Sequence, residues 1–408
     1  MLNNKSALRA VHIAIMLNSC ILLFPSKFKI YPIIIFLIFS LICTIKIIHK
    51  KPFSCKKIIL ISALFLIYIA SHLVSLKDEI AFNKIATMSS LLAYPLIFAI
   101  LDFCNFKFDN KVIKIVFIPF IASTIVFCVG SFLFFWNQKY TFLQTFVHYS
   151  NLVDIGLGNY NIHPIYLSLY VGISILMIVY LLNTTQSIYL KTVLITTGVF
   201  LTLILMILMR KGPIIFLIIS LFFYLQRLFK IRFALIAVCT VFLVMLLSLK
   251  FIPKYKDFNR FNDFRNILVE KSANSSTYIR YRIYECTIEQ IYKSPLLGYG
   301  INNVQQQLNQ CYKSKNFDAT FAGYNAHNQY ISIILTSGLV GFIIFLFTIF
   351  KIFAILSVNR NKVGLAIFIF FLLNFLTENI AEREDGILIY AFLISFFIFY
   401  KSELKTLE

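Results

Sequence analysis

The chain has 408 residues, of which 60% are hydrophobic and only 13% are charged. Soluble globular domains are usually about 45–50% apolar and about 25% charged, so the composition excludes a water-soluble enzyme, and its hydrophobicity excludes a disordered chain. With 45 phenylalanines and a net charge of +21, the chain is expected to be an all-α, polytopic membrane protein with a surplus of basic residues.

Twelve apolar segments are long enough to form helices that cross a bilayer, which takes roughly 20 residues. The first contains Arg9, His12 and Asn18, so it could instead lie at the membrane interface. The last two are short, which leaves room for a break or a re-entrant turn near 377–386. The segments are 8–24, 30–48, 58–76, 85–101, 112–135, 162–182, 189–209, 212–229, 233–251, 328–356, 363–377 and 387–400.

The distribution of Lys and Arg predicts how these segments are oriented. Short loops on the cytoplasmic side are rich in Lys and Arg, and this holds here when the N-terminus is placed inside. We therefore predict an even number of spans and two cytoplasmic termini. The chain then divides into spans one to nine at 1–249, a large outer loop at 250–326, and spans ten to twelve with a cytoplasmic tail at 327–408.

The eight cysteines are expected to lie in different compartments. Cys286 and Cys311 share the large outer loop, where an oxidising environment would allow a disulfide, so a bond between them is a hypothesis that the sequence leaves open. The sequence alone does not supply the geometry that such a bond needs. No pair of ligands has the spacing of a metal site, and we predict none.

Arg210 and Lys211 follow a long apolar run and come directly before Gly212 and Pro213. Proline fits the first turn of a helix, so a helix is expected to begin here. An arginine beside a helix N-terminus is suited to binding a diphosphate. The alternative is an arginine that extends from a helix end toward the membrane surface.

The stretch from Tyr278 to Tyr284 carries two arginines, Arg280 and Arg282, ahead of an amphipathic pattern at 281–292 that predicts a helix. It could be a solvated loop helix. It could also bind an anion through the arginines, with Tyr284 stacking on a sugar.

Two histidines border outer loops. His327 comes three residues after Tyr324 and directly before Asn328, at the start of the tenth span, where it could accept a proton near neutral pH or have a purely structural role. His163 precedes Pro164 and is interpreted first as a helix cap. Glu378 follows the eleventh span, where an acid could orient a basic partner.

These residues, in this order, resemble the O-antigen ligase and O-antigen polymerase superfamily of bacterial envelope glycosyltransferases. The resemblance covers about residues 150–400, while the first 150 residues match only in hydropathy. Lys211 stands where many members have a small residue, and Tyr284 where many have tryptophan. The stretches that carry the resemblance are Arg210 with Gly212; Arg280 and Tyr284 with 294–300; His327 and Asn328 with 337–341; and, for one branch, 163–166 and 377–383.

The resemblance implies a GT-C-like, inverting and metal-independent transferase in the bacterial inner membrane, with its active site facing the periplasm and no cofactor. The donor would be a glycan on undecaprenyl diphosphate and the acceptor a lipid A–core hydroxyl or another glycan, within membrane lipids and without nucleic acid. His327 would act as the base, and Arg210 and Arg280 would bind the diphosphate. The secondary candidates are Lys211, Arg282, Tyr284, Tyr324, Asn328, His163 and Glu378.

The motifs do not separate a ligase from a polymerase that extends the lipid-linked repeat, or from a transferase that acts on protein hydroxyls. A transporter of lipid-linked glycans is the alternative from another class. Transporters are expected to have charges or broken helices at the bilayer midplane, whereas most charges here fall in loops or at span ends.

Overall fold

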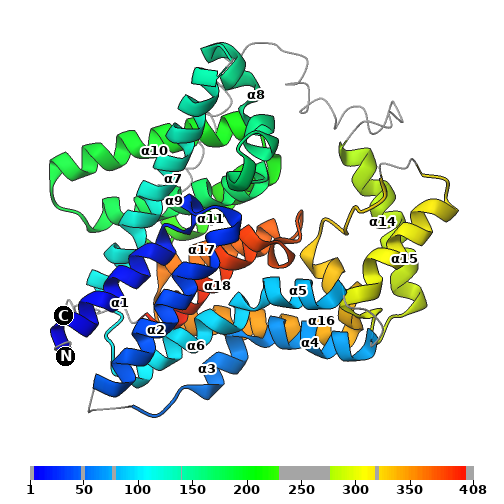
Figure 1. Cartoon of the computed structure of the whole chain (residues 1–408), viewed down its shortest axis with the longest axis horizontal. Helices are drawn as coiled ribbons and strands as arrows, with labels where there is room; N and C mark the ends of the chain where they lie inside the picture. The colour runs from blue at the N-terminus through cyan, green and yellow to red at the C-terminus, as the bar shows by residue number, and fades with distance from the viewer. Residues whose placement is uncertain are drawn as a thin grey trace.

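The computed structural model describes residues 4–46, 51–75, 80–138, 140–228, 276–317 and 321–400 (Figure 1). Within these ranges every regular element is a helix and no strand occurs, which confirms the predicted all-α class. The predicted ninth span, 233–251, and the first part of the large loop lie outside the described residues.

The other eleven predicted segments all coincide with helices. Two of them are interrupted, since 58–76 forms two helices that meet at Ser62 and 85–101 runs across a break at Ser89. The helices are α1 (Asn4–Ser19), α2 (Ile30–Lys46), α3 (Cys55–Ile61), α4 (Ala63–Ser75), α5 (Ile80–Met88), α6 (Ser90–Phe103), α7 (Asn110–Gln138), α9 (Pro164–Thr184), α10 (Ile188–Leu208), α11 (Lys211–Leu225), α16 (Gln329–Val358), α17 (Lys362–Asn374) and α18 (Glu384–Phe399).

Fewer of these helices have the length of a full span. Within the described residues, six helices are long and apolar enough to cross a membrane, or seven if α3 and α4 count as one span bent by 64°. The helices α11 and α17 are apolar but shorter. The multi-pass membrane character is therefore confirmed, while the count of twelve spans stays a prediction.

Burial separates central helices from peripheral ones. The most apolar part of α9 is 83% buried inside the protein, whereas that of α10 is 28% buried. The side chains of α18 are also almost all buried. Both α9 and α18 are apolar on every side, as expected for helices enclosed by others, and α18 lies in the middle of the molecule (Figure 1).

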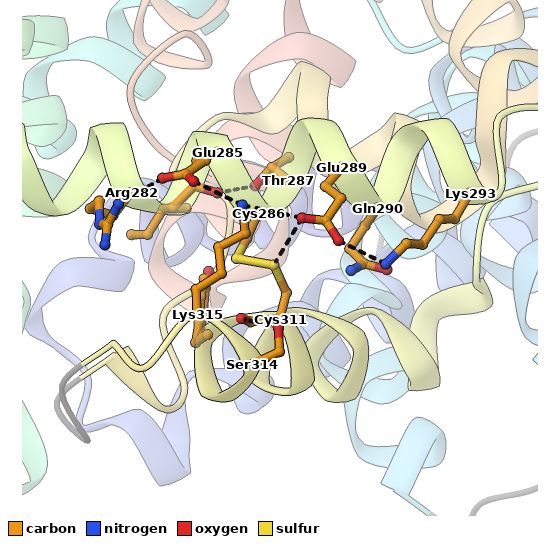
Figure 2. The surroundings of a disulfide bond; sticks show 12 residues. Arg282, Glu285, Cys286, Thr287, Glu289, Gln290, Lys293, Cys311, Ser314 and Lys315 are labelled. Atoms are coloured by element: carbon orange, nitrogen blue, oxygen red, sulfur yellow. Dashed lines mark hydrogen bonds and ion pairs between the residues drawn. A yellow bond between two sulfur atoms is a disulfide. The ribbon is translucent and has the colours of Figure 1, made fainter.

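The described part of the large loop forms two helices, α14 (Ser276–Lys293) and α15 (Gly300–Ser314). They lie to one side of the molecule, beside the ends of α4 and α16 (Figure 1). Figure 2 shows that Cys286 of α14 and Cys311 of α15 form a disulfide, the pairing that the sequence left open. Because the bond joins the helix that carries Arg280 to its neighbour, it holds the two helices together.

The sequence prediction missed two of the described helices, α15 in the large loop and another outside that loop. The segment between the fifth and sixth spans contains α8 (Phe142–Ile155), which begins with a capping box between Thr141 and Gln144. A threonine followed three residues later by glutamine is a known signal for a helix start, so the sequence did carry a clue.

The stretch 294–300 packs directly on a kink in α16. Gly338 has φ 65° and ψ −168°, a conformation that essentially only glycine adopts. The backbone N–H groups of Leu339 and Val340 donate to the carbonyls of Pro295 and Leu296, at 2.8 and 3.3 Å. Two stretches of the family resemblance therefore dock the loop helices onto the membrane helices.

We predict that Gly338→Ala destabilises the protein by at least about 2 kcal/mol, since a Cβ there would lie 2.0 Å from the Leu296 carbonyl oxygen and the backbone would be strained. Thermal unfolding in detergent measures the effect. Gly130→Ala in α7 is the matched control, because a Cβ at Gly130 meets no atom within 4 Å. Equal melting temperatures for the two variants would contradict the prediction.

Candidate active site

Arg280, His327 and Glu378 meet at one point, although they come from three separate parts of the chain. Arg280 lies on α14, His327 precedes α16, and Glu378 lies in the turn between α17 and α18. Arg280 Nη2 is 3.2 Å from Glu378 Oε1, and His327 Nδ1 is 3.3 and 3.4 Å from the two carboxylate oxygens. The structure thus joins the predicted base, one predicted diphosphate ligand and one secondary candidate in a single cluster.

Glu378 is ionised in this cluster. Burial favours the neutral acid, but the hydrogen bond from His327 and the electrostatic interactions with His327, Arg280 and His163 outweigh it, so the pKa of Glu378 is lowered. The ionic contacts of Glu378 are therefore present at neutral pH and are lost only as the pH falls through this lowered pKa.

The contact with Glu378 determines which ring nitrogen of His327 can react. An ionised carboxylate only accepts hydrogen bonds, so Nδ1 of His327 carries the proton and donates it. In the neutral ring, Nε2 then has a lone pair that can accept a proton. The side chain of His327 is 25% exposed, so the ring is partly accessible.

The backbone at His327 is unusual and firmly held. Its φ is 44°, a left-handed conformation that is uncommon for residues other than glycine. The N–H of His327 donates to Asn325 Oδ1 at 3.0 Å, and the N–H of Asn328 donates to Asn379 Oδ1 at 2.8 Å. Asn328 also caps α16 through its side chain. These bonds fix the direction in which the side chain of His327 points from the backbone.

Arg210 and His163 lie at the edge of this cluster. Arg210 precedes α11, as predicted, and its Nη2 donates to Ser150 Oγ at 3.5 Å. A Cβ at Gly212 would lie 3.0 Å from Thr377 Oγ1, so the turn that carries Arg210 packs against the turn that carries Glu378. A glycine two residues after the arginine allows this close approach.

His163 caps α9, which confirms its first interpretation. Its Nδ1 accepts a hydrogen bond from the N–H of Ile165 at 3.4 Å. Desolvation and the positive charge of Arg210 lower the pKa of His163, against the opposite effect of Asp154 and Glu378. His163 is therefore neutral at pH 7, with its proton on Nε2, where it can donate rather than accept. Nε2 of His163 is thus a hydrogen-bond donor, whereas Nε2 of His327 is an acceptor.

Residues 196–346 match the family model described as O-antigen ligase. This match confirms the superfamily predicted from the motifs. The matched segment contains Arg210, Arg280 and His327, whereas His163 and Glu378 lie outside it. The match does not separate ligases from polymerases.

A further comparison finds 29% identity over 119 residues with an uncharacterized protein of Haemophilus influenzae. The alignment covers 28% of this chain and 29% of that relative. Because the shared part is less than a third of either protein, the relative supplies no activity.

The remaining predicted residues have different surroundings. The Tyr324 ring lies 5.9 Å from the His327 ring, between centroids. Tyr284 packs against the core of the loop helices. Arg282 pairs with Glu285 at 3.0 Å and lies over the Phe317 ring at 4.0 Å, so its charge is used within the loop region. Lys211 is the first residue of α11.

The sequence did not reveal a second polar network beside the cluster. Glu382 Oε1 accepts hydrogen bonds from Tyr68, Gln329 and Ser332, and Oε2 accepts one from Asn379. Asn379 links this network to the backbone N–H of Asn328, the residue after His327. Glu382 lies in the stretch 377–383 that carried the resemblance, but nothing in the sequence identified Tyr68 as its partner.

No group of three or more His, Cys, Asp or Glu residues that could hold a metal ion occurs in the described part of the chain. The polar residues of the cluster are an arginine, a histidine and one carboxylate. This set can bind an anion and accept a proton.

Proposed function

We propose that the protein is an O-antigen ligase-type glycosyltransferase, which moves a polysaccharide from undecaprenyl diphosphate to a lipid A–core hydroxyl. The family match supports the reaction class. The observation that carries the proposal is the contact between His327 and Glu378, since it leaves Nε2 of His327 as a base beside Arg280. The cluster thus combines a proton acceptor with a cation for the leaving group.

The proposed reaction is a single displacement. The acceptor hydroxyl gives its proton to Nε2 of His327 while its oxygen attacks the anomeric carbon. The bond between that carbon and the diphosphate oxygen breaks, and the diphosphate leaves with the electron pair. Arg280 and Arg210 stabilise its growing negative charge, and the attack from the opposite side inverts the anomeric centre. Glu378 holds the imidazolium that forms.

The proposed location is the bacterial inner membrane, with both termini in the cytoplasm and the cluster at the periplasmic surface. The basic cytoplasmic loops support this orientation. The acceptor and the lipid-linked donor would then meet at the outer face of the membrane.

The transporter alternative receives little support from the broken helix α3–α4. Transporters place charges or unwound backbone at such breaks to bind substrates and ions. Between Ile58 and Ser71, on both sides of the break, no residue is charged. The charged cluster lies instead at helix ends far along the chain.

A lipopolysaccharide gel on a strain that lacks the gene tests the proposal. For a ligase, we expect core without long chains and an accumulation of lipid-linked polymer. A single repeat attached to core would instead identify a polymerase. Normal long chains on core, with no accumulation of lipid-linked polymer, would contradict the transferase proposal.

We also predict that transfer by the purified protein persists in EDTA. Arg210 and Arg280 would stabilise the charge of the leaving diphosphate and His327 would accept the proton, so no metal ion would be needed. The assay follows transfer from a lipid-linked donor before and after chelation. A loss of activity that Mg²⁺ restores would contradict the metal-independent mechanism.

A further inference from the structure

A separate pocket of about 330 Å³, lined by both polar and apolar residues, adjoins the catalytic cluster. Its walls come from α4, α5, α15, the loop before α16, the start of α16 and the turn before α18. This volume is at the lower end of the range for small-ligand sites, about 300–1,000 Å³. The polar residues that matter for its chemistry are Lys84, Gln305, Asn325, Ser332, Glu382 and Arg383.

The charges of the pocket favour an anion. The Glu382 carboxylate already accepts hydrogen bonds from four side chains, so it has little capacity left for a ligand. Lys84 uses one of its three N–H groups, for the Ile301 carbonyl at 3.2 Å. The backbone carbonyl of Arg383 accepts a hydrogen bond from the N–H of Ile387, but its guanidinium has neither a hydrogen bond nor an ion pair with any residue that the structure describes. The pocket is therefore lined by two cations and by one carboxylate whose two oxygens both already accept hydrogen bonds.

The position of the pocket connects it to the acceptor. Asn325 and Ala326 line it, and Asn325 Oδ1 holds the backbone N–H of His327. The pocket therefore shares a wall with the residue that would take the acceptor proton. Neither Arg210 nor Arg280 lines it, so the diphosphate ligands of the donor lie elsewhere.

We propose that this pocket binds a sugar of the acceptor that carries an anionic group, either a carboxylate or a phosphate, close to the reacting hydroxyl. Lys84 and Arg383 bind the anionic group, while Gln305 and Ser332 contact the sugar hydroxyls. This assignment rests on the proposed transferase function and adds the class of acceptor that the enzyme prefers.

The test measures binding to the full chain in nanodiscs with methyl glucuronide, glucose 6-phosphate and neutral methyl glucoside as probes. We expect the wild type to bind one or both acidic probes at least about tenfold more tightly than the glucoside, as charge-assisted hydrogen bonds are the stronger ones. Arg383→Gln and Lys84→Met should each remove most of this preference. The two acidic probes tell a carboxylate from a phosphate.

Arg360→Gln is the matched control. Arg360 lies just beyond the far end of α16, whose 30 residues span about 45 Å, so its loss should leave all three affinities unchanged. Thermal unfolding of each variant shows whether it folds, and the preference of the wild type tests the proposal even if a variant does not.

Any one of three results would overturn the proposal. The first is equal binding of acidic and neutral probes by the wild type, and the second is an unchanged preference for acidic probes in folded Arg383→Gln and Lys84→Met. The third is pyrophosphate binding that these two variants lose but Arg280→Gln keeps. The last result would place the donor diphosphate in the pocket. Binding does not require transfer, so a wild type that binds the acidic probes but transfers no glycan would overturn only the proposed function. Normal transfer without the preference would overturn only the pocket.

Discussion

His327→Ala should lower the rate of glycan transfer by about 10²–10⁴-fold, the usual contribution of a general base. The reason is the orientation of the ring, because Glu378 accepts a hydrogen bond from Nδ1 and leaves Nε2 as the proton acceptor. Binding of the lipid-linked donor should change little, since the proposed diphosphate ligands are arginines. Transfer assays at saturating donor, together with donor-binding measurements, separate these two effects.

Two further variants define what His327 contributes. His12→Ala, in α1, is the matched control, because its ring packs on Phe106 and not near the cluster. It should transfer at the normal rate. The transfer rate of Glu378→Gln should lie between those of His327→Ala and His12→Ala. The amide can still lie beside His327, but it has no charge with which to stabilise an imidazolium. Full activity of His327→Ala would remove this residue from catalysis.

Most helices could be predicted from the sequence because membrane helices need long apolar runs. The predictions failed where an apolar run does not define one straight helix. The run 58–76 contains the 64° bend at Ser62, and nothing in its composition marks that position. The amphipathic helix α8 was hidden for the opposite reason, since its 14 residues are too polar and too short to be read as a span.

The members of the candidate site were predicted, but their pairing was not. The motifs indicated Arg280, His327 and Glu378 separately, whereas the contact between Arg280 and Glu378 crosses 98 positions of sequence. Such a contact depends on how α14, α16 and α17 pack. The same holds for Tyr68 and Glu382, which lie 314 positions apart. The resemblance also gave no structural role to Gly338, which the backbone contacts with Pro295 and Leu296 now explain.

Arg280→Lys should lower transfer by about tenfold or more, although it keeps the positive charge. The guanidinium of Arg280 directs one N–H group at Glu378, and its planar fork has further donors for a diphosphate. An ammonium group is a point charge on a flexible stem and cannot reproduce this bidentate geometry. The main effect should appear in donor binding and in the rate of diphosphate departure, both measurable in the transfer assay.

Arg282→Lys is the matched control for this prediction, since it makes the same exchange two residues away on the same helix. The charge of Arg282 is already used by Glu285 and the Phe317 ring, so its exchange should leave transfer close to normal. A surface pair of this kind contributes about 0–1 kcal/mol, which keeps the effect on folding small. If both variants lost activity equally, the loss would come from α14 as a whole. If Arg280→Lys were fully active, a single positive charge beside Glu378 would suffice, and bidentate binding by Arg280 would be wrong.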